Sequence, residues 1–131
     1  MRIHRPGQDI TFDAAADLST HQFKFVIGAA ASGNSQLARV TVATANARTI
    51  GILQNKPNAA NLGAVVRVSG TSKLNVDTSA VVVGSPLKSD GSGNGTLAGV
   101  DKDKVGAIAL EANGGAAVII EALIMNYDLA V

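Results

Sequence analysis

The chain contains no cysteine and no tryptophan, and its only aromatic side chains are three phenylalanines and one tyrosine. The absence of cysteine excludes disulfide bonds, thiolate nucleophiles and cysteine-ligated zinc. Because aromatics are so few, the apolar 47% of the chain consists mostly of Val, Ile, Leu and Ala. Side chains of this size favour thin sheets that pack closely or are shared between subunits.

Strong net charge and long apolar runs are also missing. Eleven basic residues against ten acidic ones leave a formal charge of +1, which gives no support for an electrostatic hold on nucleic acid or anionic lipid. The longest apolar stretch, residues 116–120, falls well short of the roughly 20 residues that span a bilayer. The amino terminus reaches no apolar run of signal-peptide length. We therefore expect no membrane segment, no secretion signal, and neither nucleic acid nor membrane as a partner.

The length of 131 residues predicts one domain, and a charged fraction of only 16% is too low for a disordered chain. β-Branched residues cluster in short runs that Gly, Asn, Asp or Pro interrupt, a pattern typical of strands. Strands are predicted over residues 8–12, 22–28, 36–43, 48–54, 62–69, 71–76, 104–112 and 116–127, with a hairpin within 81–97 and a loop over 13–20. We predict an all-β, compact single domain over residues 10–131, a barrel or sandwich of short strands with little helix, preceded by an arm over residues 1–9.

Individual residues add detail to the predicted strands and turns. Phe23, Phe25 and Ile27 alternate with other residues and predict one apolar face for the second strand. Gly70 predicts a bulge or sharp bend between two strands. The run DGSGNG at residues 90–95 predicts a hairpin with a loose, exposed tip, and NGG at residues 113–115 predicts a second hairpin.

The last strand is apolar in both of its alternating sets, so it is expected to be covered on both faces. In a domain of this size the second cover can come from another subunit, which predicts a homotrimer. Its core or interface is expected to contain Ile120, Leu123, Ile124, Arg67 and Glu121. Glu121 interrupts this strand and needs a partner or solvent. Arg67, set in a Val-rich strand, is the candidate partner.

Candidate catalytic and metal sites are weak. Asp17, Ser19 and His21 are near neighbours, but three polar residues in one loop rarely converge as a catalytic triad does. Residues 91–95 lack the helix and the Lys-Ser/Thr pair of a phosphate-binding loop, and residues 101–104 lack the further ligands of a calcium loop and fit a solvated turn. We expect no catalytic residue, no metal and no cofactor, hence no enzyme.

Four segments occur in an order that resembles a known family. They are RTIGILQNKP at residues 48–57, VVRVSG at 65–70, GSPLKSDG at 84–91 and VGAIALEA at 105–112, and the resemblance covers about residues 48–125. In strand-and-turn order and in residue type the chain resembles the small capsid decoration, or cement, proteins of tailed bacteriophages.

The resemblance implies a β-rich trimer on the outer surface of a mature icosahedral head, at or near its local three-fold positions. Such a protein clamps adjacent major capsid subunits, belongs to the virion, and is made in the cytoplasm of the bacterial host. It binds no small-molecule substrate. Members commonly use a terminal arm, so contact with the capsid is expected from Arg2, Ile3, His4, Arg5 and Pro6. Loops over residues 55–61 and 89–95 are the next candidates for this contact.

Two other classes compete with this interpretation. A receptor- or glycan-binding domain of a phage fibre or spike would favour exposed aromatic platforms for sugars. A small hydrolase or ligand-binding barrel would need a pocket of convergent polar groups.

Overall fold

The computed structural model describes residues 7–30 and 38–131. Within these ranges the chain forms nine strands and no helix, and so has no helical segment long and apolar enough to cross a membrane. The strands are β1 (Gly7–Ala14), β2 (Phe25–Ala29), β3 (Arg39–Val42), β4 (Gly51–Leu53), β5 (Gly63–Asn75), β6 (Pro86–Ser89), β7 (Gly95–Leu97), β8 (Lys104–Ala109) and β9 (Ile119–Asp128). The predicted all-β class is confirmed.

The first five strands close into a ring. They follow the order β1-β3-β2-β4-β5, and β5 pairs back onto β1. β1 runs parallel to β3, and the other four pairings are antiparallel. The result is a small barrel, one of the two architectures that the sequence predicted.

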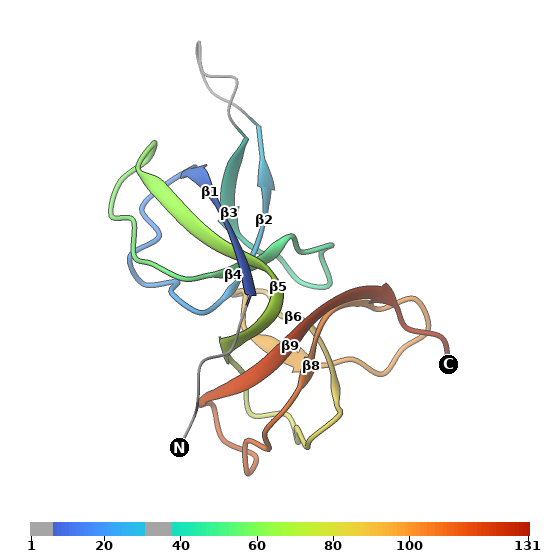
Figure 1. Cartoon of the computed structure of the whole chain (residues 1–131). Helices are drawn as coiled ribbons and strands as arrows, with labels where there is room; N and C mark the ends of the chain where they lie inside the picture. Colours follow the sequence, from blue (N-terminus) through green and yellow to red (C-terminus); the bar gives the residue numbers. More distant parts are fainter. Residues whose placement is uncertain (1–6, 31–37) are drawn as a thin grey trace.

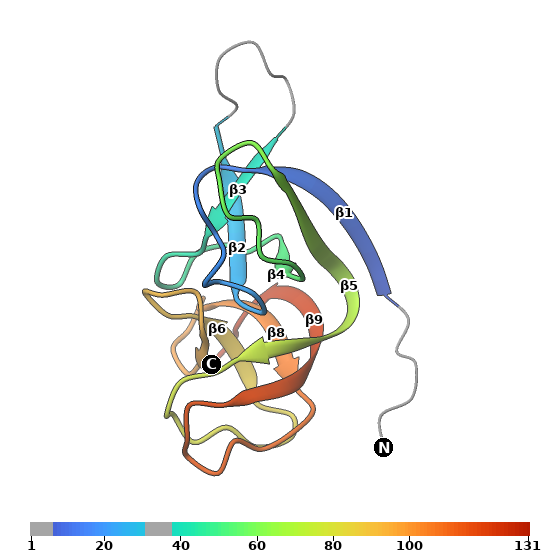
Figure 2. The ribbon, with the colours of Figure 1, turned by 90° about the vertical axis from the view of Figure 1, so that its left-hand side faces the viewer.

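The remaining strands build a second sheet onto the same β5. Its order is β5-β9-β8-β6-β7, all antiparallel, and a parallel bridge between Val76 and Gly95 connects its far edge to the residue after β5. Figures 1 and 2 show the barrel stacked above this second sheet, with β5 running through both.

β5 is one strand bent at Gly70, where the sequence predicted a break between two strands. Residues up to Gly70 pair with β1, and residues from Thr71 onward pair with β9. Gly70 has a φ of 85°, a left-handed conformation that glycine adopts without steric cost. The bend that was predicted is present, but the strand continues through it.

Two hydrophobic cores follow from the alternation of side chains along shared strands. On β2, Val26 packs in the barrel core whereas its neighbour Phe25 packs in the core of the second sheet. On β4, Leu53 packs in the barrel core and Ile52 packs in the core of the second sheet. Because successive residues of a strand point to opposite faces, β2 and β4 separate the two cores and serve both.

β2 begins at Phe25, three residues later than predicted. Phe23 lies in a turn with a φ of 63°, and the turn is closed by the Lys24 N–H donating to the His21 carbonyl at 3.1 Å. The Phe23 ring instead lies under the Lys73 ammonium, 5.6 Å from its centroid. The predicted apolar face that joins Phe23 to Phe25 is therefore wrong.

The hairpin of β6 and β7 is confirmed, but its tip is not loose. The Gly93 carbonyl accepts a hydrogen bond from the Phe25 N–H at 2.8 Å, and Gly93 is buried. Asp90 Oδ1 accepts the N–H groups of Ser92 and Asn94 at 2.8 and 2.9 Å. The tip is held against the start of β2, which leaves only Gly91 and Ser92 exposed.

The predicted hairpin of the last two strands is also confirmed, because β8 pairs antiparallel with β9. Both strands are set back from the NGG turn, and residues 110–118 form the connection between them.

Gly51 provides a test of the close packing between β4 and β5. A Cβ atom at this position would lie 2.2 Å from the Arg67 carbonyl oxygen and 2.7 Å from Val66 Cγ1. Gly51→Ala should lower the free energy of unfolding by at least about 2 kcal/mol, because backbone must move. Gly28→Ala is the matched control on β2, where nothing lies within 4 Å of the added Cβ. Equal urea midpoints for the two variants would contradict this packing.

Candidate functional site on the outer faces of β5 and β9

The predicted arm is divided by the structure. Arg2, Ile3, His4, Arg5 and Pro6 lie outside the described residues, so their contact with a capsid stays a prediction. Residues 7–9 form the beginning of β1 and pair with β5, with Asp9 opposite Arg67.

The predicted residues of the last strand separate onto its two faces. Ile120 is only 3% exposed, and both it and Ile124 pack in the core of the second sheet. Leu123 points to the opposite face and is half-buried. Ile119 and Met125 are 49% and 44% exposed, so β9 carries apolar side chains on its outer face as well.

An apolar row crosses the outer face of the second sheet. Pro86 on β6 is opposite Ile108 on β8, Ile108 is opposite Leu123 on β9, and Leu123 is opposite Thr71 on β5. Residues opposite one another in a sheet share a face. We name Pro86, Ile108, Leu123 and Thr71 the apolar row. All four are half-buried, and the row lies beside the exposed Met125, so this face suits contact with a partner.

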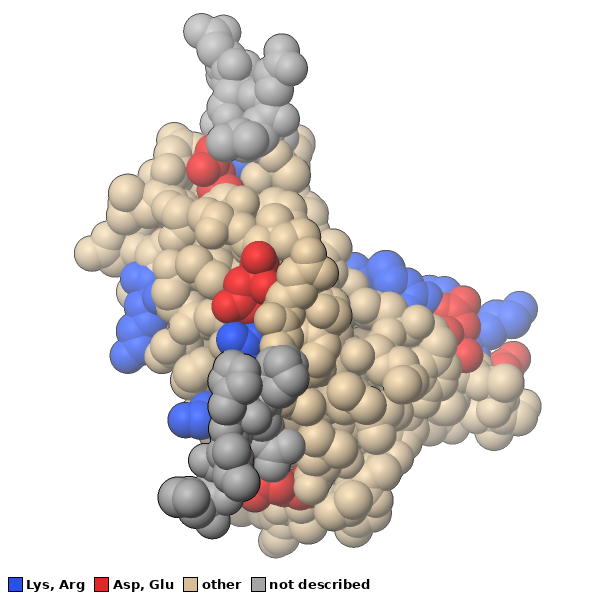
Figure 3. All heavy atoms as spheres, viewed as in Figure 1, with Lys and Arg blue, Asp and Glu red and all other residues tan. Residues whose placement is uncertain are grey.

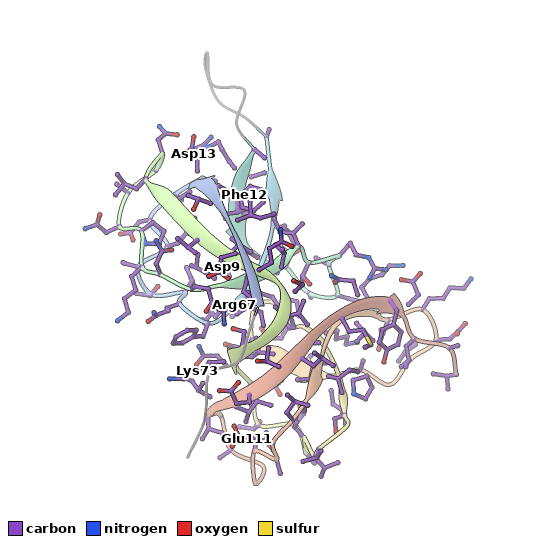
Figure 4. The ribbon with its side chains drawn as sticks, in the orientation of Figure 1. Asp9, Phe12, Asp13, Arg67, Lys73 and Glu111 are labelled. Carbon is purple, nitrogen blue, oxygen red and sulfur yellow. The ribbon has the colours of Figure 1, made fainter. Side chains whose placement is uncertain are left out.

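At the edge of this face, Arg67 connects three strand segments (Figure 4). Its Nε and Nη2 atoms donate to the two carboxylate oxygens of Asp9 on β1, at 2.8 and 3.2 Å. Its Nη1 atom donates to the Thr71 carbonyl at 3.1 Å, across the bend at Gly70. The guanidinium therefore ties β1 to both parts of β5.

This geometry corrects the expected pairing of Arg67 with Glu121. The hydrogen bond from Arg67 lowers the pKa of Asp9, and the same bond raises the pKa of Arg67, to which the charge of Glu121 adds a smaller rise. Glu121 is 5% exposed and lies opposite Lys73, and its N–H donates to Glu111 Oε1 at 2.8 Å. Asp9, assigned to the arm from the sequence, lies on β1 opposite Arg67.

A second ionic contact lies on the same sheet, at the loop before β8. Asp103 Oδ2 accepts the N–H groups of Gly99 and Val100 at 3.0 and 2.9 Å and the Lys88 ammonium at 3.0 Å. The Val100 N–H is the main reason that the pKa of Asp103 is lowered. Asp103 is 4% exposed, so the solvated turn predicted for residues 101–104 is wrong at this residue.

The weak catalytic candidates form a local turn. Asp17 Oδ1 accepts the Ser19 N–H at 2.9 Å, and burial lowers the pKa of His21. In the part of the chain that is described, no group of three or more His, Asp or Glu side chains is placed to hold a metal ion.

Charged side chains are unevenly distributed over the view in Figure 3. Asp9 and Arg67 lie near its centre, basic and acidic atoms gather together toward the end of β9, and the lower end is mostly without charge apart from acidic atoms in the region of Glu111. The surfaces that distinguish this domain are thus an apolar sheet face and a lower end with few charged atoms.

The fold defines a class of all-β domains in which a small barrel and a second sheet share one strand. No protein-family model and no curated protein matches the chain. One solved structure, the N base of the head fiber gp8.5 of bacteriophage phi29, is similar with a TM-score of 0.66 and 14% sequence identity. The match covers 95% of this chain and 100% of that one, so the likeness in fold extends over nearly the whole domain.

The Asp9–Arg67 pair can be measured with a double-mutant cycle. Because 37% of the Asp9 side chain is exposed, we expect the Ala substitutions to give a coupling of at most about 1 kcal/mol in unfolding free energy, which salt reduces. A parallel cycle between Arg67 and Asp13, a second carboxylate of β1, should give no coupling. Equal couplings in the two cycles would contradict the assignment.

Asp103 predicts a pH dependence of stability. The pKa of Asp103 in the folded chain is below the ordinary 3.8. Its contribution to the free energy of unfolding is therefore present above pH 3.8 and is lost as the pH falls through the pKa of the folded chain. Asp103→Asn should be less stable than wild type at neutral pH, and its unfolding free energy should fall less steeply below about pH 4. Asp101→Asn, in the same loop but exposed, should follow wild type. Parallel pH curves for wild type and Asp103→Asn would be the contrary result.

Proposed function

We propose that this chain is a structural protein of a phage virion, which binds the outer surface of the capsid as a trimer and stabilises the mature head by clamping adjacent major capsid subunits. The observation that carries the proposal is the likeness in fold, over 95% of the chain, to a base of a phage head fiber. The segments at residues 48–57, 65–70, 84–91 and 105–112 support it independently through their resemblance to capsid decoration proteins.

The apolar row supports the trimer. A trimer with a three-fold axis forms when one surface of each subunit meets a different surface of the next. Leu123 and its neighbours supply one such surface, and Met125 extends it along β9. Three of the four side chains of the row are apolar, so few polar groups, which are costly to bury without partners, would be covered there.

A trimer would bind the capsid firmly even where each subunit makes only weak contacts with it. Each capsid-facing patch is repeated three times, so weak affinities combine through effective concentration. The arm residues Arg2–Pro6 are part of this proposal as a predicted capsid contact.

A role as a receptor- or glycan-binding fibre domain is the second candidate, since the similar structure belongs to a head fiber. All four aromatic side chains of the chain are described, and none of them is exposed. Phe25 is fully buried, and Phe12, Phe23 and Tyr127 are half-buried. The surface therefore offers no aromatic platform for a sugar, which favours the first candidate.

The proposal is tested on purified heads that were assembled without this chain. The full-length protein should cosediment with the heads and raise the temperature at which they release DNA. In solution, light scattering should give three times the chain mass of 13.2 kDa. Leu123→Lys should reduce the mass to that of a monomer, whereas Ser92→Lys, on the exposed hairpin tip, should not. Absence of cosedimentation, or binding to a glycan array or turnover of a hydrolase substrate in its place, would contradict the proposal.

A further inference from the structure

At the lower end of the molecule, a segment of each of two loops carries no charge, and these segments are bordered by the half-buried Asp77 and Glu111. Residues 78–87 and 112–120 contain no Asp, Glu, Lys, Arg or His. In Figures 1 and 2 the loop between β5 and β6 and the loop between β8 and β9 lie next to each other at this end, away from the barrel. We name their exposed apolar side chains the uncharged pole: Val82, Val83, Ala116, Ala117, Val118 and Ile119.

These side chains are well exposed although they are apolar. The exposed fractions are 60% for Val82, 67% for Val83, 42% for Val118 and 49% for Ile119. The tip of a turn is ordinarily built from Gly, Asn, Asp, Ser or Pro. Val82 and Val83 occupy such a tip without packing in either hydrophobic core. A partner that covers them would account for their presence.

Asn113 holds the two loops together. Its Nδ2 donates to the carbonyls of Asp77 and Ser79 at 2.9 and 2.7 Å, and its Oδ1 accepts the N–H groups of Val81 and Gly115 at 3.1 and 2.9 Å. The side chain is buried, at 6% exposure. The pole is therefore organised before any partner arrives, which avoids the entropic cost of ordering loops on binding.

We propose that the uncharged pole is the surface through which the trimer sits on the capsid, and that its partner there is an uncharged, apolar recess of the shell. This inference rests on the proposed function. In a trimer with one three-fold axis, the sides of the subunits meet each other, and a given end of every subunit faces the same way. The apolar row lies on a side of the second sheet, whereas the pole lies at its end, so three poles can face the shell together.

The lack of charge selects the kind of partner. An apolar patch without charge gains nothing from a charged surface and would have to strip water from it. A recess lined with apolar side chains is the surface that projecting Val82 and Val83 fit. Because the pole itself forms no ion pairs, its share of the binding should depend little on ionic strength, whereas exposed charge contacts such as those predicted for the arm weaken as salt screens them.

The test measures binding of full-length protein to purified heads assembled without it, at about 50 and 500 mM salt, which differ strongly in screening length. The factor by which Val83→Ser weakens binding should change less than about threefold between them, while Val83→Asp and Val118→Asp should each weaken binding at least about tenfold. Val83→Ser, which removes apolar surface without adding charge, should weaken it in the same direction. Ala60→Asp adds the same charge to an exposed loop of the barrel and should bind as wild type.

Mass and thermal midpoint are measured for every variant, and both should match wild type. If folded pole variants bind heads normally, or if the effect of Val83→Ser disappears at high salt, the inference is wrong while the proposed function stands. Pole variants that become monomeric would show that a second copy covers the pole, which also overturns the inference. Failure of the wild-type protein to bind heads at either salt concentration would instead overturn the proposed function.

Discussion

The structure depends on one bend in one strand. β5 takes part in both the barrel and the second sheet, and it changes direction at Gly70, which has a φ of 85°. Arg67 spans that bend by donating to the Thr71 carbonyl on one side and to Asp9 of β1 on the other. Closure of the barrel and attachment of the second sheet therefore meet at a single guanidinium. The two cores also share strands, because Phe25 and Ile52 extend from barrel strands into the core of the second sheet.

Local features of this fold could be predicted from the sequence, because strands and turns depend on neighbouring residues. The period-two runs identified the strands, and the DGSGNG and NGG segments identified both hairpins. Long-range features could not. Asp9 and Arg67 are 58 residues apart, and no pattern in either segment indicates the other. Phe23 has the spacing of a strand residue, but the turn at residues 21–24 overrides it with a positive φ. The parallel pairing of β1 with β3 likewise depends on how the barrel closes.

The candidate surface was predicted in part for the same reason. Two alternating apolar sets marked the last strand as unusual, and the structure divides them between the core, where Ile120 lies, and the outer face, where Leu123 lies. Leu123 continues a row through Ile108 and Pro86 only because of the register in which β9, β8 and β6 pair. No local sequence pattern indicates that register. The sequence identifies Asn113 as a turn residue, but its three side-chain hydrogen bonds to a separate loop and a fourth within its own loop make it the organiser of one end of the molecule.

A likeness in fold at 14% identity means that ring closure and a shared strand can be built from very different side chains. What a domain of this kind binds is therefore decided by its surfaces rather than by its topology. Closure of the barrel pairs strand edges that would otherwise bind other chains, so the barrel leaves sheet faces and loop ends for contacts. Here the apolar row occupies a face and the uncharged pole occupies an end. Because the two surfaces are built by different residues, one partner can be bound through the row while the pole remains free for another.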